Sequence, residues 1–105
     1  MPGELEQLVL LALMRLGADA DAGAIAGELR QRAERRVLLA TLHRTLARLE
    51  AKGLVTSRMG EPTARRGGRR RRHYAITQAG RESAISSLEA IRRLASGLEL
   101  GWRTP

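Results

Sequence analysis

The sequence predicts a mainly α-helical protein with one small β-hairpin, and three observations point to that fold class. Aliphatic side chains recur every three or four residues through the first half of the chain, which is the period of an amphipathic helix. Around residues 54–77 the period falls to two, on either side of a glycine- and arginine-rich stretch, and helical spacing then returns. Aromatic residues are only 2% of the 105 residues, so the core has to be aliphatic, which suits packed helices better than packed sheets.

Two helices are expected in the N-terminal third. The first spans about residues 4–16 with one aliphatic face, and Gly17 supplies its C-cap. Asp19 or Asp21 is a suitable N-cap for the second helix, which ends near Arg32. The inward side chains are Leu5, Leu8, Val9, Ala12, Leu13 and Leu16 of the first helix, and Ile25, Ala26 and Leu29 of the second.

A third helix is expected over about residues 38–52, and Gly53 stops it. Leucines at helical spacing give it a buried stripe, formed by Leu39, Leu42, Leu46 and Leu49. The opposite face is small at its N-terminal end and basic further along. The side chains expected on this exposed face include Ala40, Thr41, Arg44, Thr45 and Arg48.

A β-hairpin with a long basic tip is expected after the third helix. Residues 54–59 and 72–77 alternate as strands do, with Tyr74 and Ile76 on one face. The residues between them favour turns, and they include Gly60, Pro62, Gly67 and Gly68.

A last helix is expected from Gln78 to about Gly97, with Thr77 as its N-cap. Its aliphatic stripe runs for four turns, more than one small core needs, which predicts a contact with a second copy of the chain. The residues expected in this dimer contact are Leu5 and Leu8 of the first helix and Ile85, Leu88, Ile91, Leu94 and Leu98 of the last. Residues 99–105 are expected to be a flexible end, in which Trp102 either docks across the dimer or is exposed.

Three helices, a basic hairpin and a fourth helix follow one another in the order of a winged helix-turn-helix. Residues 1–77 are thus expected to form a DNA-binding domain, and residues 78–98 a dimerisation helix. In such a domain the third helix enters the major groove, while the hairpin, or wing, lies along the backbone or in the minor groove. The residues expected at the DNA are Ala40, Thr41, His43, Arg44 and Arg48 of the helix, and Arg66, Arg69, Arg70, Arg71 and Arg72 of the wing. Because strand side chains alternate, Arg70 and Arg72 are not both expected on the face of Arg71.

The charge balance indicates a polyanionic partner. The chain has 19 Lys and Arg against 11 Asp and Glu, a formal net charge of +8, and Lys52 is its only lysine. Double-stranded DNA is the expected partner. One alternative stays open, in which the winged helix is a protein-interaction module whose basic hairpin docks on an acidic protein or an anionic surface.

No enzyme chemistry, cofactor or metal site is expected. The lack of cysteine removes disulfides, thiolate nucleophiles and sulfur-ligated zinc, and no serine has a neighbouring histidine and acid. The glycines of "RRGGRR" lack the Lys-Ser/Thr of a phosphate-binding loop, and His43 and His73 have no carboxylates at ligand spacing. Glu4 and Glu6 precede a short apolar run with no cationic leader, so a cytoplasmic protein without a signal peptide or membrane span is expected.

Four segments in this order resemble the PadR family of bacterial transcriptional regulators, from about Glu4 to Leu98. They are "LEQLVLLALMRLG", "TLHRTLARLEAKGLVTSRMGE", "GGRRRRHYAIT" and "TQAGRE". The resemblance implies a homodimeric repressor whose last helix pairs with its symmetry mate on a palindromic operator. The short last helix is similar to that of the smaller family members.

Two positions depart from the family's pattern. The second helix begins "DAGAIA" where members usually carry His-Gly-Tyr or a similar aromatic, and His43 stands where they usually have Tyr. The resemblance implies a contact with the DNA backbone at this position, which one imidazole N–H can also make. Family members often respond to aromatic or drug-like effectors, but Tyr74 and Trp102 are the only aromatic residues here, so no effector site is carried over.

Overall fold

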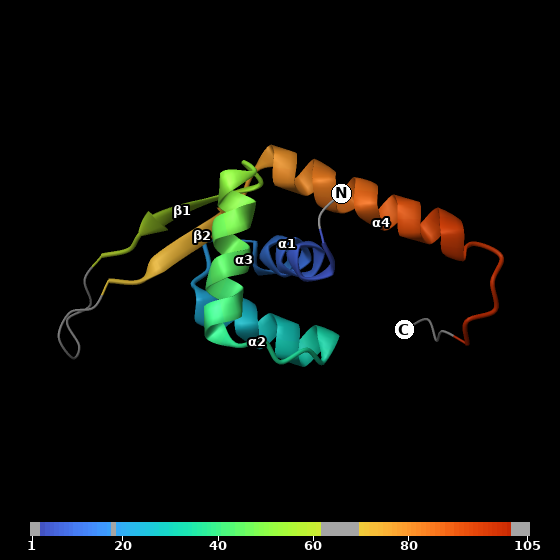
Figure 1. Cartoon of the computed structure of the whole chain (residues 1–105), viewed down its shortest axis with the longest axis horizontal. Helices are drawn as coiled ribbons and strands as arrows, with labels where there is room; N and C mark the ends of the chain where they lie inside the picture. Colours follow the sequence, from blue (N-terminus) through green and yellow to red (C-terminus); the bar gives the residue numbers. More distant parts are fainter. Residues whose placement is uncertain (1–2, 18, 62–69, 102–105) are drawn as a thin grey trace.

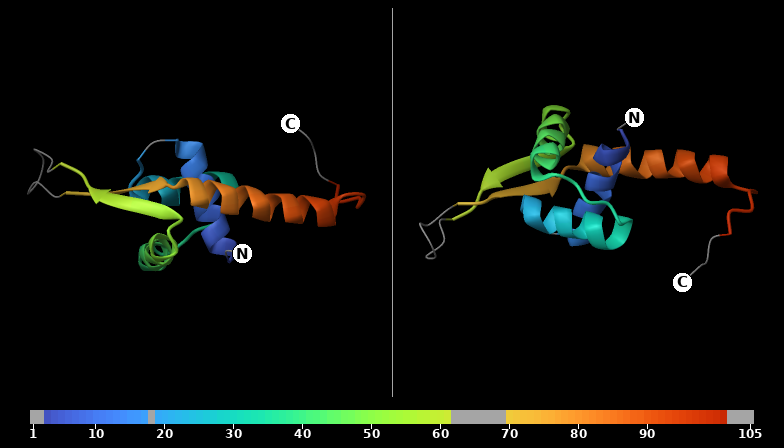
Figure 2. Two further views of the ribbon diagram at one scale, coloured as in Figure 1. Left: turned by 90° about the horizontal axis from the view of Figure 1, so that it is seen from above. Right: turned by 60° about the horizontal axis from the view of Figure 1, so that its bottom comes forward.

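The computed structural model describes residues 3–17, 19–61 and 70–101 of the chain. Its elements follow in the order α1 (Glu4–Leu16), α2 (Ala22–Ala33), α3 (Leu39–Ala51), β1 (Val55–Met59), β2 (Arg72–Ile76) and α4 (Gln78–Ala95). The predicted fold class is confirmed, because the protein is mainly α-helical with an antiparallel hairpin (Figure 1). Figure 2 shows α1, α2 and α3 gathered in one unit, with the hairpin leaving it on one side and α4 on the other.

The first two helices are bounded by caps that the sequence predicts. Gly17 adopts a left-handed conformation, with φ 72°, and donates its N–H to Leu13 O at the end of α1. Of the two candidate aspartates, Asp21 caps α2, where it accepts the Ala24 N–H at 2.9 Å. Helix α2 continues one residue beyond Arg32.

The core lies where the first three helices meet the base of the hairpin. It is aliphatic, as expected, apart from Tyr74 on β2. The largest of its fully buried aliphatic side chains are Val9, Leu10, Ile25, Leu42, Leu46, Leu49 and Val55.

The prediction for α3 was wrong at two positions. Leu39, predicted to be buried, is 55% exposed, and Thr45, predicted to be exposed, is 2% exposed. At about 100° per residue the buried face is centred near Leu42 and Leu49, and Thr45 lies closer to this centre than Leu39 does. The Thr45 hydroxyl is tolerated there because it donates to Thr41 O at 2.9 Å.

The base of the hairpin is held by β2. Val55 pairs with Ile76 and Ser57 with Tyr74, and Tyr74 and Ile76 pack against the core from the same face, as predicted. Tyr74 also exchanges two backbone hydrogen bonds with Ala20, at 2.8 and 3.0 Å. The loop between α1 and α2 is therefore fastened to the free edge of β2.

Each predicted strand is one residue longer than the observed one. Leu54 lies just before β1, and Thr77 lies between β2 and α4. The Thr77 N–H donates to Leu54 O at 3.1 Å, and the Thr77 hydroxyl accepts the Gly80 N–H as the predicted N-cap. Helix α4 ends at Ala95, before the predicted end, because Ser96 is extended.

The first half of α4 packs on the rest of the protein, and the second half leaves it. Gly80, Ala84 and Ser87 are its buried positions. Gln7 Nε2 of α1 donates to Ala84 O at 2.9 Å. Beyond Ser87 the helix extends away from the core (Figure 2).

Gly80→Ala is expected to lower the free energy of unfolding by about 1–3 kcal/mol. The added Cβ would clash with Leu54 O and lie 2.8 Å from Ile76 Cγ1, so α4 would have to shift. Gly27→Ala in α2 is the matched control, since nothing lies within 4 Å of its Cβ, and it is expected to raise the free energy of unfolding by about 0.4–1 kcal/mol. Urea unfolding followed by circular dichroism measures both, and an unchanged midpoint for Gly80→Ala would contradict the close approach.

Candidate nucleic-acid interface

The outward face of α3 carries the side chains predicted to read DNA. Ala40, His43, Arg44 and Arg48 are exposed, and Thr41 is half-buried at the edge of this surface. Arg44 Nη2 donates to Thr41 Oγ1 at 3.3 Å, so the guanidinium points toward the N-terminal end of the helix. The five predicted residues of α3 therefore share one half of the helix circumference.

Acidic side chains do not interrupt this surface. The one carboxylate of α3, Glu50, lies near the C-terminal end of the helix and accepts the Ser57 hydroxyl of β1 at 2.9 and 3.0 Å. Arg44 and Arg48 therefore extend without a carboxylate of α3 beside them. An approaching phosphate or guanine edge meets no local competitor on the helix.

Each described arginine of the hairpin has an acceptor within the chain. The acceptors are Asp19 for Arg58 at 2.6 Å, Gly60 O for Arg70 at 2.9 Å, Asp21 for Arg71 at 2.9 Å, and Ser57 Oγ for Arg72 at 3.0 Å. Arg66 and Arg69, which are also predicted at the DNA, lie outside the described residues, as does Trp102.

Arg58 belongs to this basic wing although it is not among the predicted DNA contacts. It lies on β1 opposite His73, and its side chain is exposed. Strand alternation could have revealed it, because Val55 faces the core and an arginine three residues later faces outward.

Arg71 and Arg72 are adjacent in the sequence but turn to opposite sides. Arg72 donates to Ser57, which also binds Glu50 of α3, whereas Arg71 pairs with Asp21 at the N-terminus of α2. The wing is thus connected to α2 through Arg71 and to α3 through the Ser57 hydroxyl.

The Asp21 carboxylate remains charged at neutral pH. Its pKa is lowered, first because it accepts the Ala24 N–H and second because it binds Arg71, while partial burial acts in the opposite direction. Since the folded-state pKa is the lower one, the stability from these contacts is present at neutral pH and is lost as the pH falls through that pKa.

An exposed aliphatic stripe continues along the second half of α4. It prolongs the face that is buried at Ala84 and Ser87, and Leu94 within it is 83% exposed. Its members on α4 are the predicted dimer residues Ile85, Leu88, Ile91 and Leu94; the predicted Leu98 is also exposed but lies after the end of the helix. The other two predicted dimer residues, Leu5 and Leu8, are half-buried against the core of their own chain. No helix in the described part of the chain is both long and apolar enough to cross a bilayer.

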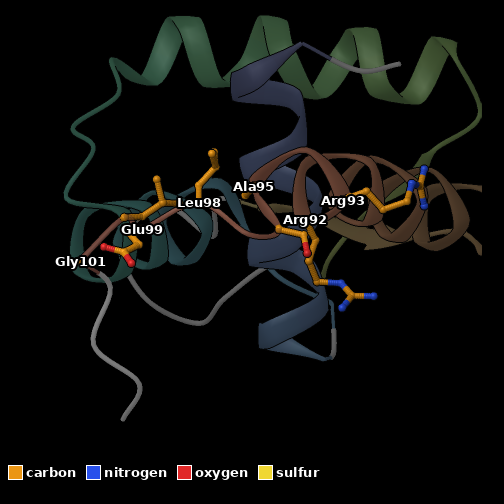
Figure 3. A pocket seen from close by; sticks show the side chains of 8 residues that line it. Arg92, Arg93, Ala95, Leu98, Glu99 and Gly101 are labelled. Atoms are coloured by element: carbon orange, nitrogen blue, oxygen red, sulfur yellow. The ribbon is translucent and has the colours of Figure 1, made fainter.

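Two open cavities lie outside the α3 surface. One of about 540 Å³ is bounded by the last turn of α4 and the segment after it; Figure 3 shows Arg92 and Arg93 on the former and Leu98 and Glu99 on the latter. The other, of about 240 Å³, lies between α1 and α2. Over residues 3–17, 19–61 and 70–101, neither lining includes an aromatic side chain, and no group of three His, Asp or Glu side chains is placed to hold a metal ion.

Comparison with known families matches residues 10–85 to the transcriptional regulator PadR-like family. None of the curated proteins matches the chain.

Several solved structures share this fold. A PadR family transcription regulator from Clostridium difficile R20291 is 25% identical, with a TM-score of 0.73 over 88% of this chain and 91% of that one. A PadR family transcriptional regulator from Eggerthella lenta DSM 2243 is 26% identical, with a TM-score of 0.69 over 90% of this chain and 81% of that one. Bacillus subtilis PadR, solved in complex with operator DNA, is 16% identical, with a TM-score of 0.68 over 81% of this chain and 46% of that one.

Proposed function

The chain belongs to the PadR-like family of transcriptional regulators, and from this premise we propose that it is a homodimeric repressor that binds a palindromic DNA operator. The observation that carries the proposal is the outward face of α3, where Arg44 and Arg48 are exposed beside a basic hairpin. The operator complex of Bacillus subtilis PadR, a protein of the same fold, supports DNA as the partner. DNA as the target places the site of action in the cytoplasm.

In this proposal α3 enters the major groove. The small side chain of Ala40 allows the backbone to approach, and Thr41 and Arg44 reach base edges. An arginine at this position is suited to the O6 and N7 acceptors of guanine. His43 and Arg48 contact the flanking phosphates.

The arginines of the wing contact the phosphates of the DNA backbone in this proposal. Arg70 and Arg72 flank the base of the tip, and Arg66 and Arg69 are predicted to extend the same basic surface. Contacts of this kind position the protein without reading sequence, and they weaken as salt increases.

The stripe on α4 brings two copies together, with Leu5 and Leu8 at the margin of the contact. A continuous row of exposed aliphatic side chains on a small protein favours an interface. Two-fold symmetry then accounts for a palindromic operator, with half-sites separated by about 10 bp or a small multiple of it.

Fluorescence anisotropy with the DNA upstream of the protein's own gene, and with a scrambled duplex, tests the proposal. We expect tighter binding to the upstream DNA, and a logarithmic salt slope of about −0.9 for each phosphate contacted. Equally weak binding to both duplexes at every salt concentration would contradict sequence-specific DNA binding, and would favour an acidic protein or anionic surface as the partner of the wing.

A further inference from the structure

Asp21 joins the wing to the helix-turn-helix with both of its carboxylate oxygens. Oδ1 accepts the Ala24 N–H at 2.9 Å and so caps α2. Oδ2 accepts from Arg71 Nη1 at 2.9 Å. The backbone just before Asp21 is also fixed, because the preceding residue, Ala20, exchanges two backbone hydrogen bonds with Tyr74 of β2.

The two members of this ion pair differ in exposure. The Asp21 side chain is 22% exposed, whereas that of Arg71 is 70% exposed. A guanidinium has five N–H donors, and Asp21 takes one of them. Arg71 therefore has a fixed inner edge and a solvent-facing outer edge that still carries donors.

We propose that Asp21 is a positioning residue for DNA binding, which aims the outer edge of the Arg71 guanidinium at a DNA phosphate. This inference rests on the proposed function. An unrestrained arginine loses side-chain freedom when it binds a phosphate, and an arginine already held by a carboxylate loses less.

Repulsion between Asp21 and the phosphate is the effect that opposes this arrangement. The carboxylate lies at the N-terminus of α2, where the helix dipole contributes about half a positive charge. The dipole therefore offsets part of the carboxylate charge, and Arg71 attracts both the carboxylate, at 2.9 Å, and the phosphate. We expect the gain from a guanidinium that is already held in place to exceed the repulsion that remains.

Two substitutions separate this role from helix capping. Asp21→Asn keeps an oxygen for the Ala24 N–H but places an amide NH₂, which cannot accept, toward Arg71. Asp21→Ser also keeps the cap and is too short to hold Arg71. Glu82→Gln, at an exposed position on α4, removes one negative charge elsewhere and is the matched control.

Anisotropy with the upstream and scrambled duplexes should show effects of opposite sign for the control and for the Asp21 variants. Removing a carboxylate from a chain of net charge +8 should by itself strengthen DNA binding slightly, as expected for Glu82→Gln. Asp21→Asn and Asp21→Ser are instead expected to weaken binding roughly threefold to tenfold. Both duplexes should be affected by the same factor, because a phosphate contact carries no sequence information.

A double-mutant cycle with Arg71→Ala completes the test. Once Arg71 is alanine, Asp21→Asn should no longer weaken binding and should show only the slight strengthening expected for Glu82→Gln, because the residue acts through that guanidinium. Binding by Asp21→Asn as tight as that of Glu82→Gln, or an undiminished effect in the Arg71→Ala background, overturns the inference. If the wild-type chain binds neither duplex, both the proposed function and the role of Asp21 are overturned. If the wild-type chain binds the upstream DNA specifically but the Asp21 variants do not weaken that binding, only the role of Asp21 is overturned.

Discussion

Leu88→Glu is expected to convert the proposed dimer into a monomer and to weaken operator binding by about 10²- to 10⁴-fold. Two-fold symmetry brings the new carboxylate into the α4 contact from both copies, where it loses water without gaining a partner. A monomer holds one half-site, so the second half-site no longer adds to the affinity. Sedimentation equilibrium should give a mass near the 11.5 kDa of one chain, and anisotropy should give the loss in affinity.

Two further substitutions exclude a general effect of a charge on α4. Leu94→Glu should have the same result as Leu88→Glu, and at 83% exposure Leu94 contributes little to the core of its own chain. Ser86→Glu places the same charge on the opposite face of the helix, where an exposed serine now lies, and should leave the dimer intact. A dimer that survives both leucine substitutions would show that the stripe does not join two copies.

The helices and their caps could be predicted because their signals are local. Asp21 and Thr77 each accept an N–H from a residue three positions later, and Gly17 ends α1 through its own conformation. Such interactions depend on a few neighbouring residues, and those can be recognised directly in the sequence. The change of period after Gly53 identified the hairpin for the same reason.

The features that escaped prediction depend on residues far apart in the chain. The rotation of the buried face of α3 toward Thr45 follows from how the helix meets the core, which an aliphatic pattern does not specify. Arg71 and Asp21 are 50 residues apart, and Gln7 and Ala84 are 77 residues apart. The basic wing could therefore be recognised as a cluster of charge, but the partner of each arginine could not.

Arg44→Ala is expected to reduce affinity for the upstream DNA by about 30- to 3 × 10⁴-fold. A bidentate arginine–guanine contact is worth about 1–3 kcal/mol, and a dimer would lose two of them. We choose Arg44 for this substitution because its side chain is exposed and its guanidinium donates to the Thr41 hydroxyl one turn earlier in α3. Anisotropy with the upstream and scrambled duplexes separates lost base contacts from lost charge.

The ratio of the two affinities identifies what Arg44 contacts. If Arg44 reads bases, Arg44→Ala lowers affinity for the upstream duplex far more than for the scrambled one. Arg44→Lys should then restore the general attraction but not the ratio, because an ammonium lacks the planar fork of donors. Arg93→Ala, which removes a cation near the distal end of α4, controls for net charge and should leave the ratio unchanged. An equal loss on both duplexes would instead assign Arg44 to the phosphate backbone, and base recognition would then have to come from the other exposed residues of α3.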